Sequence, residues 1–168
     1  MIKDLKQVLG EEYCLACKGC CRFQSAQSLW RPKVYPSEEV FSKRDPVNKD
    51  ILDKTGRIAT QIFGKEHICA FLDPLTNKCR TYSSRPFECQ LYPFVFIKED
   101  QGLVLGVHLA CPFVQDAQAS QMFERYCKDL EGFFHQPTMQ SFLAAHLNDI
   151  SSSHIQKDEI QILFRLSS

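Results

Sequence analysis

CLACKGCC, residues 14–21, places four of the nine cysteines of this chain within eight positions. These four residues, Cys14, Cys17, Cys20 and Cys21, form a C-x2-C-x2-C-C pattern. A tight turn across a C-x2-C spacing aims two thiolates at the same ion, so this stretch predicts a metal-binding loop. Gly19 suits such a loop, because a backbone that folds around a metal centre needs positive φ or close approach. Neighbouring side chains in extended backbone point to opposite sides, so Cys20 and Cys21 are suited to serve two centres.

A second group of cysteines lies further along the chain: Cys69, Cys79, Cys89 and Cys111. Cys69 and Cys79 flank a predicted turn over residues 73–78, which would bring their sulfurs together. Ferredoxin loops combine C-x2-C-x2-C with a remote Cys-Pro, and here Pro112 follows Cys111. Eight cysteines make two sets of four ligands, or one centre with spare structural thiols.

The composition narrows the class of protein. The 168 residues match the length of one domain, and 20 basic residues balance 20 acidic ones, which argues against a nucleic-acid binder. We expect no membrane span, because no apolar stretch approaches about 20 residues. The first 14 residues do not resemble a secretory signal, so we expect a cytoplasmic protein. Disulfides are rare in that compartment, and the nine cysteines are an odd number, so metal ligation is the better explanation for them.

The pattern of apolar residues predicts an α+β fold: a small, helix-rich single domain with a short β-hairpin region and cysteine-bearing loops around a metal site. We expect helices over 37–64 (broken at Pro46), 116–134 and 138–150, and strands over 67–72, 94–97 and 103–109. The tail EIQILFRL suits either a strand or a short helix. The single domain, 1–168, would consist of a metal-chelating region, about 14–113, and a helical C-terminal region, about 114–168.

These motifs carry a family resemblance. CLACKGCC, CAFLD, CRTYSSRPFECQLYPF and CPF together resemble the CxxCxxCC, or YkgJ-type, cysteine-cluster family, whose domain is described as chelating zinc or iron. The resemblance implies that the eight cysteines from Cys14 to Cys111 are the ligand set. It also implies a surrounding framework of Tyr82, Arg85, Pro86, Tyr92, Pro93 and Phe94. It implies no particular reaction and does not extend to the C-terminal third.

The spacing favours an iron–sulfur cluster, with zinc as the alternative. Four thiolates suit both, but structural zinc sites have two separated C-x2-4-C pairs, which the second cysteine group lacks. Four thiolates around either centre leave a net charge of about −2, which requires compensation. Arg85 lies in sequence between two predicted ligands, Cys79 and Cys89, and directly before a proline. We therefore predict that it binds the cofactor by donating a hydrogen bond to one of its sulfurs, or that it donates to a nearby carbonyl.

Other residues are weaker candidates. Cys127 lies on the apolar stripe of a predicted helix, so we expect it to pack in the core. His67 and His108 lie close to cysteines, but we expect them to bond their neighbours and not to replace a thiolate. The sequence identifies no catalytic residue.

We therefore predict a cysteine-ligated metal-binding protein that carries an iron–sulfur cluster in a redox, sensing or modification-accessory role. One alternative is a zinc-stabilised module that binds a protein partner without catalysis. Another is part of a protein-modifying enzyme, because similar cysteine motifs occur in larger flagellin lysine methylases. The chain lacks a Gly-rich nucleotide loop that would hold a methyl donor.

Overall fold

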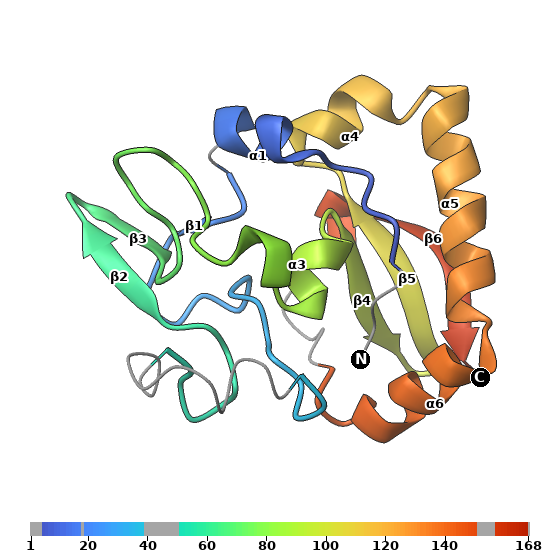
Figure 1. Cartoon of the computed structure of the whole chain (residues 1–168). Helices are drawn as coiled ribbons and strands as arrows, with labels where there is room; N and C mark the ends of the chain where they lie inside the picture. The colour runs from blue at the N-terminus through green and yellow to red at the C-terminus, as the bar shows by residue number, and fades with distance from the viewer. Residues whose placement is uncertain (1–4, 18, 39–50, 151–156, 168) are drawn as a thin grey trace. The chain divides into compact units, whose positions relative to one another are not determined.

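The computed structural model describes residues 5–17, 19–38, 51–150 and 157–167 (Figure 1). Its contacts divide the chain into two compact units, residues 1–90 and 91–168. Each unit contains one three-stranded sheet. The two units are described in turn.

The sheet of the first unit contains β1 (Arg22–Phe23), β2 (Thr60–Phe63) and β3 (Glu66–Cys69), with β3 in the middle. Both pairings are antiparallel, and Thr60 lies opposite Cys69 at the end of the β2–β3 hairpin. Gly64 turns this hairpin with a φ of 62°, a conformation that glycine adopts without steric cost. The predicted strand over 67–72 therefore exists, but it begins one residue earlier and ends at Cys69.

The helix expected over 37–64 is wrong for the part that can be compared. Residues 39–50, including Pro46, lie outside the described residues. Residues 51–63 instead form a turn closed by the Gly56 N–H to Asp53 carbonyl bond, a bridge between Leu52 and Ile58, and strand β2. The isoleucines fall by coincidence at helical spacings, and such β-branched residues also favour extended backbone.

The CLACKGCC stretch is also not simply a loop. Helix α1 (Glu11–Cys17) contains Cys14 and Cys17, and only Cys20 and Cys21 follow in a turn. Glu11 and Glu12 lie in its first turn, where acidic side chains complement the positive end of the helix dipole. The 3-10 turn η2 (Tyr82–Ser84) and helix α3 (Phe87–Leu91) complete this part of the chain.

The second unit is built on the antiparallel sheet β4-β5-β6. The predicted hairpin is confirmed as β4 (Phe94–Glu99) and β5 (Gly102–His108). The C-terminal tail, which the sequence left open, is strand β6 (Ile160–Ser167), which follows the 3-10 turn η3 (Lys157–Glu159). Strand β5 is buried along Leu103–Val107, because it pairs on both edges and is covered on both faces.

Three helices accompany this sheet: α4 (Pro112–Ala117), α5 (Gln121–Phe134) and α6 (Pro137–His146). The single helix predicted over 116–134 is interrupted, because Ser120 caps α5 by accepting a hydrogen bond from the Phe123 N–H at 3.1 Å. Aromatic pairs fix α5 on the sheet: Phe94 stacks on Phe123 at 5.8 Å, and Phe96 meets Phe134 edge-on at 5.6 Å.

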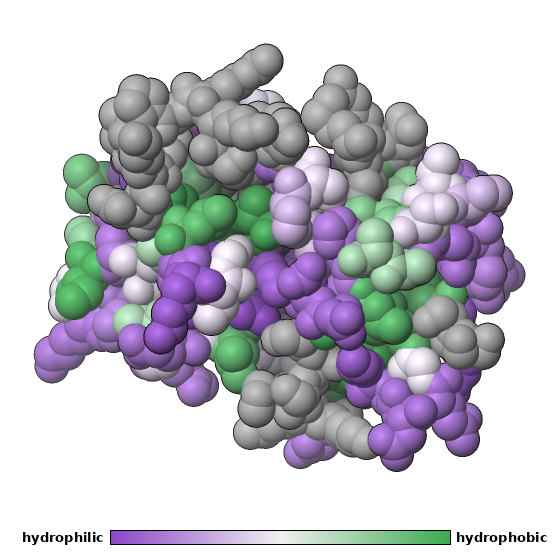
Figure 2. Space-filling model, turned by 90° about the horizontal axis from the view of Figure 1, so that it is seen from below, coloured by the Kyte–Doolittle hydropathy of each residue, from purple (hydrophilic) through white to green (hydrophobic). Residues whose placement is uncertain are grey.

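The expected helix-rich fold is therefore wrong: the described residues form two three-stranded antiparallel sheets with five α-helices, a mixed α/β protein. The prediction counted 37–64 as helix and left the tail open. No helix in the described ranges is long and apolar enough to cross a bilayer. Hydrophilic residues cover much of the face in Figure 2, and hydrophobic residues come to the surface in several separate places.

Candidate metal centre

Seven of the eight predicted ligands belong to the first unit. Cys14 and Cys17 lie on α1, Cys20 and Cys21 in the following turn, Cys69 at the end of β3, Cys79 in a β-bridge, and Cys89 on α3. Cys111 belongs to the second unit, where it directly precedes α4. All nine cysteines are among the described residues, and none forms a disulfide.

Four of these cysteines share one hydrophobic core. Its buried members are Phe23, Val34, Ile58, Ile68, Cys69, Phe71 and Leu72. Cys21, Cys79 and Cys89 pack against this core as half-buried residues, together with Trp30, Ile51, Leu52 and Ala70. Cysteines of four separate segments thus gather where apolar side chains exclude water.

The strand register explains why Cys21 meets Cys69. Strand β1 pairs Arg22 with Ile68, so the next step of the antiparallel ladder sets Cys21 opposite Cys69. The Cys69 N–H donates to the Cys21 carbonyl at 2.8 Å, which shows that the pairing continues for this residue. Directly opposed residues have Cβ atoms about 5 Å apart, so two segments 48 positions apart in sequence bring their thiols together.

The predicted 73–78 turn brings Cys79 back to the same region. Asp73 accepts from the Leu75 N–H at 3.0 Å, and Asn77 has a φ of 57°, which reverses the chain. Cys79 then forms a bridge with Leu72, three residues after Cys69. The turn predicted from its Asp, Pro and Asn residues is present, and it returns the chain so that Cys79 lies beside Leu72.

The pKa values of these thiols also reflect their closeness to one another. Burial, together with the nearby thiols of Cys21 and Cys79, raises the pKa of Cys69 to about 12. Burial also raises the pKa of Cys89 well above its usual range, with contributions from Cys69, Cys21 and Cys79. These thiols are neutral at pH 7, so binding a cation here releases protons.

Cys20 and Cys21 do not face opposite sides. The two thiols hydrogen-bond to each other, and this bond raises the pKa of Cys20 and lowers the pKa of Cys21. The expectation of opposed side chains assumed extended backbone, whereas Gly19 and Arg22 close a turn here with a 3.0 Å hydrogen bond. Gly19 is not one of the glycines with a positive φ. A Cβ at this position would lie 3.2 Å from the Cys17 sulfur, so glycine is favoured by the close approach of that sulfur.

Arg85 lies beside the N-terminal cysteines. Its guanidinium is 3.7 Å from the centre of the Tyr82 ring, and its Nη1 is 4.0 Å from the Cys14 sulfur. Its Nη2 donates to Gln7. Burial raises the pKa of Cys14, and the positive charge of Arg85 opposes that rise; the same charge lowers the pKa of Cys21. The Arg85 Nε is buried and has no acceptor among the described residues, which leaves one donor for a further group.

Two side chains that the sequence did not single out hold the cysteine segments in place. Asn77 donates from Nδ2 to the Leu15 carbonyl at 2.6 Å and reaches the Cys14 carbonyl at 3.5 Å. These are carbonyls of the last turn of α1, which no helical N–H satisfies. Gln61 donates to the carbonyls of Cys69 at 3.2 Å and Leu72 at 2.8 Å. The local sequence marks Asn77 as a turn residue, but it does not predict the contacts of either amide, because their partners lie outside the local turn or strand.

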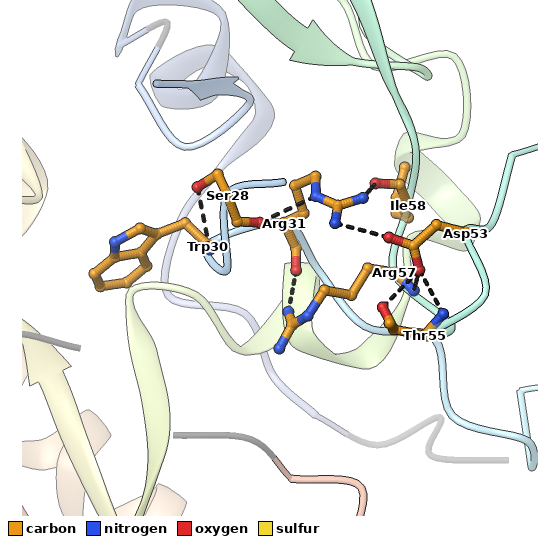
Figure 3. Close-up of polar contacts among 7 residues, drawn as sticks. All are labelled: Ser28, Trp30, Arg31, Asp53, Thr55, Arg57 and Ile58. Carbon is orange, nitrogen blue, oxygen red and sulfur yellow. Dashed lines mark hydrogen bonds and ion pairs between the residues drawn. The ribbon is translucent and has the colours of Figure 1, made fainter. Parts of the chain in front are cut away.

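A buried polar network supports the other side of the core (Figure 3). Arg31 is 6% exposed; it forms an ion pair with Asp53 at 2.7 Å and donates to the Ile58 carbonyl at 3.3 Å. Asp53 also accepts from Thr55, and Arg57 donates to the Arg31 carbonyl. The network ties the 28–31 segment to the 53–58 turn, which supplies Ile58 to the core.

Glu88 anchors the helix that carries Cys89. It accepts from the Lys33 N–H at 2.7 Å and from the Tyr35 hydroxyl at 2.8 Å. Burial raises the pKa of Glu88, and these two hydrogen bonds oppose that rise. A carboxylate next to a predicted ligand thus fixes α3 against the 33–35 segment.

The donor set suits a soft or borderline metal, because it consists of thiols with an apolar shell and an arginine beside it. As the side chains stand, no three Cys, His, Asp or Glu residues within the described ranges are arranged to hold a metal ion, so binding requires the thiols to close around it. His67 is adjacent to this region, and its Nδ1 has no partner among the described residues. His108, in the second unit, hydrogen-bonds with Tyr92 at 3.0 Å, in line with its expected neighbour bonding.

Comparison with known proteins adds a family. Neither the curated proteins nor the solved structures include a significant match to this chain. The model of the CxxCxxCC family, described as "Putative zinc- or iron-chelating domain", matches residues 13–128, which is more than half of the chain. That range contains all nine cysteines and extends into α5. The chain belongs to the CxxCxxCC family of zinc- or iron-chelating domains.

Proposed function

We propose that this protein binds an iron–sulfur cluster through cysteines of residues 14–89 and uses it in a redox, sensing or modification-accessory role. The observation that supports this is the gathering of six thiols from separate segments into one electrostatically coupled group: Cys14, Cys20, Cys21, Cys69, Cys79 and Cys89.

Core packing alone does not account for this group. A buried cysteine can serve as a small hydrophobe, but that role does not require several thiols to be neighbours. Their mutual proximity raises the pKa values of Cys69 and Cys89, which is the repulsion that a bound cation would relieve. Cysteines held as neighbours without disulfides also suit a reducing compartment such as the cytoplasm.

The spacing of the thiols favours a cluster over one zinc ion. A tetrahedral zinc ion and a cubane cluster both accept four thiolates, so the number of thiols does not separate them. The C-x2-C-x2-C spacing of Cys14, Cys17 and Cys20 is that of ferredoxin loops. When bound, a cluster supplies one-electron redox chemistry. The chain's own contribution is to hold the thiols, shield them with Ile68 and Phe71, and offset negative charge with Arg85.

The test is purification without oxygen, followed by an absorbance spectrum and counts of iron, zinc and acid-labile sulfide on the same sample. We expect a brown protein with iron and sulfide in equal amounts. A colourless protein with one or two zinc ions and no sulfide would contradict the cluster.

A zinc-stabilised binding module is the second candidate, favoured by one observation. On β2, the outer strand of the sheet that carries Cys69, Ile62 is 75% exposed and Phe63 is 42% exposed. Exposed apolar side chains on an edge strand are suited to contact a protein partner. Zinc without sulfide, and partner capture that is lost in an Ile62→Lys variant but kept in a Lys65→Glu variant, would favour this candidate.

A further inference from the structure

We propose that Cys21, Cys69, Cys79 and Cys89 form one four-thiolate metal site, with Cys14, Cys17 and Cys20 outside its ligand set. The inference rests on the proposed metal-binding function and assigns the ligands within it. It differs from the ferredoxin-type assignment, in which three ligands would come from the CLACKGCC stretch itself.

The first argument is the shared apolar environment. Among the cysteines, the hydrophobic core of the first unit contains Cys69 and packs against Cys21, Cys79 and Cys89, and against no other cysteine of the described residues. Cys20 is exposed, and neither Cys14 nor Cys17 is among the residues that pack against this core. A thiolate centre is stabilised by exclusion of water and by close dipoles. Among the cysteines, only Cys69 and the three that pack against its core share such an apolar surrounding.

The second argument is the backbone that carries these residues. Cys21 and Cys69 lie opposite each other in the β1–β3 ladder, joined by the 2.8 Å N–H to carbonyl bond. Cys79 reaches the same end of β3 through its bridge with Leu72. Gln61 and Arg80 donate to the carbonyls of Cys69, Ala70 and Leu72, and these bonds support the loop between Cys69 and Leu72. Three ligands are therefore placed by regular pairing and not by a free loop.

The fourth ligand comes from α3. Glu88 fixes this helix through Lys33 and Tyr35, so Cys89 is held against the core from another side. Four thiolates are the number that one tetrahedral ion or one cubane cluster accepts.

The remaining three cysteines have other surroundings. Cys14 and Cys17 are three positions apart on α1, so their side chains share one helical face. Cys14 is near Arg85 and Tyr82, whereas the sulfur of Cys17 is close to Gly19. Cys20 is exposed and lies in the turn that the Arg22 N–H to Gly19 carbonyl bond closes.

The experiment uses the full chain, reduced and metal-free, with cobalt(II) alone as the probe. Wild-type protein with and without cobalt is alkylated briefly, and each cysteine is quantified by mass spectrometry. We expect cobalt to protect Cys21, Cys69, Cys79 and Cys89 and to leave Cys14, Cys17, Cys20 and Cys127 reactive. Because this arm needs no variant, a folding defect cannot obscure it.

The second arm measures thiolate-to-cobalt charge-transfer intensity in single Cys→Ser variants. Cys79→Ser and Cys89→Ser should lose about a quarter of the intensity per cobalt, one thiolate of four, and bind cobalt at least about tenfold more weakly. Cys14→Ser, Cys17→Ser and the control Cys127→Ser should match the wild type.

The outcomes separate the two proposals. Protection or intensity loss at Cys14 and Cys17 equal to that at Cys79 and Cys89 would overturn the ligand assignment but leave metal binding intact. A wild-type protein that binds neither cobalt, zinc nor iron would overturn the proposed function itself.

Discussion

At the scale of single residues, the cysteine region depends on side chains that are not cysteine. Arg85 places a positive charge beside Cys14 and stacks on Tyr82. Asn77 uses one amide to hold the carbonyl end of the helix that carries Cys14. The contacts of Arg85 with Cys14 and of Asn77 with Leu15 join residues more than 60 positions apart, and each can be tested by one substitution.

Removing the charge of Arg85 should make Cys14 less reactive. Its positive charge opposes the rise in pKa that burial causes, so Arg85→Gln should raise the pKa of the Cys14 thiol further. The measurement is the alkylation rate of Cys14 against pH in metal-free protein, with the profile expected to move to higher pH. Arg80→Gln is the matched control, because Arg80 donates to the Ala70 carbonyl and is not among the charges that shift Cys14. An unchanged profile would show that Arg85 does not act on Cys14 in solution.

Replacing the amide of Asn77 should loosen α1. Asn77→Asp keeps the size and tolerance of positive φ but removes the N–H donor, so the Leu15 carbonyl loses its partner. An unsatisfied buried carbonyl costs about 1 to 3 kcal/mol, a loss that urea unfolding should detect. Hydrogen exchange of residues 14–17 should also accelerate. The control is Asn148→Asp, and equal exchange rates in both variants would refute the role of Asn77.

At the scale of elements, the two sheets are built on different principles. The first is short, and its order β1-β3-β2 joins residue 22 to residue 68, which brings the cysteine segments together. The second is a longer meander with an aromatic face against α5. In the second sheet, the side chains of Ile97 and Ile160 occupy the space beside Gly106. A Cβ at Gly106 would lie 2.7 Å from Ile97 and 2.5 Å from Ile160.

The turn over residues 53–58 should make the first unit sensitive to acid. Burial raises the pKa of Asp53, but hydrogen bonds from Thr55, Arg31 and Arg57 outweigh it and lower the pKa from 3.8 to about 2. A lowered native pKa stabilises the fold above pH 3.8, and that stability is lost as the pH falls from 3.8 toward 2. Wild-type protein should therefore show a steep fall in thermal midpoint across this window.

Asp53→Asn should remove much of that pH dependence. It should also cost about 1 to 2 kcal/mol at neutral pH, because Arg31 loses its ion pair and keeps only its carbonyl acceptors. Thermal melts at several pH values compare it with Asp129→Asn, which changes an exposed aspartate on α5. A variant that retains the full wild-type slope would show that another group titrates in this window.

At the scale of the whole molecule, the ligands predicted from sequence fall in two units, seven in residues 1–90 and Cys111 in residues 91–168. If the four-thiolate site is correct, metal binding is confined to the first unit. We expect cobalt(II) to slow hydrogen exchange around residues 21, 69–79 and 87–90 and to leave residues 103–114 unchanged. A Cys111→Ser variant should bind cobalt as wild type does. Slower exchange around residue 111, with weaker binding in that variant, would instead make Cys111 a ligand.

Local sequence patterns were sufficient to predict those elements whose structure depends on their own residues. The turn after Leu72, the hairpin before residue 109 and the apolar stripe of α5 can all be predicted from the sequence, because turn chemistry and periodicity are short-range. The extended backbone of residues 51–63, where the sequence predicted a helix, could not be read locally. Their β-branched residues are compatible with a helix or a strand, and the hydrogen bonds of Ile58 with Pro32 and of Ala59 with Ile51 select the extended form.

The number and spacing of the thiols, which match a family, are enough to identify a cysteine-based metal-binding protein. Which thiols are neighbours follows instead from how the strands pair and pack. Cys21 lies closer in sequence to Cys17 than to Cys69, yet strand register and apolar burial place it with Cys69. The physical reason is that ligand grouping depends on long-range pairing and water exclusion, which no local spacing encodes.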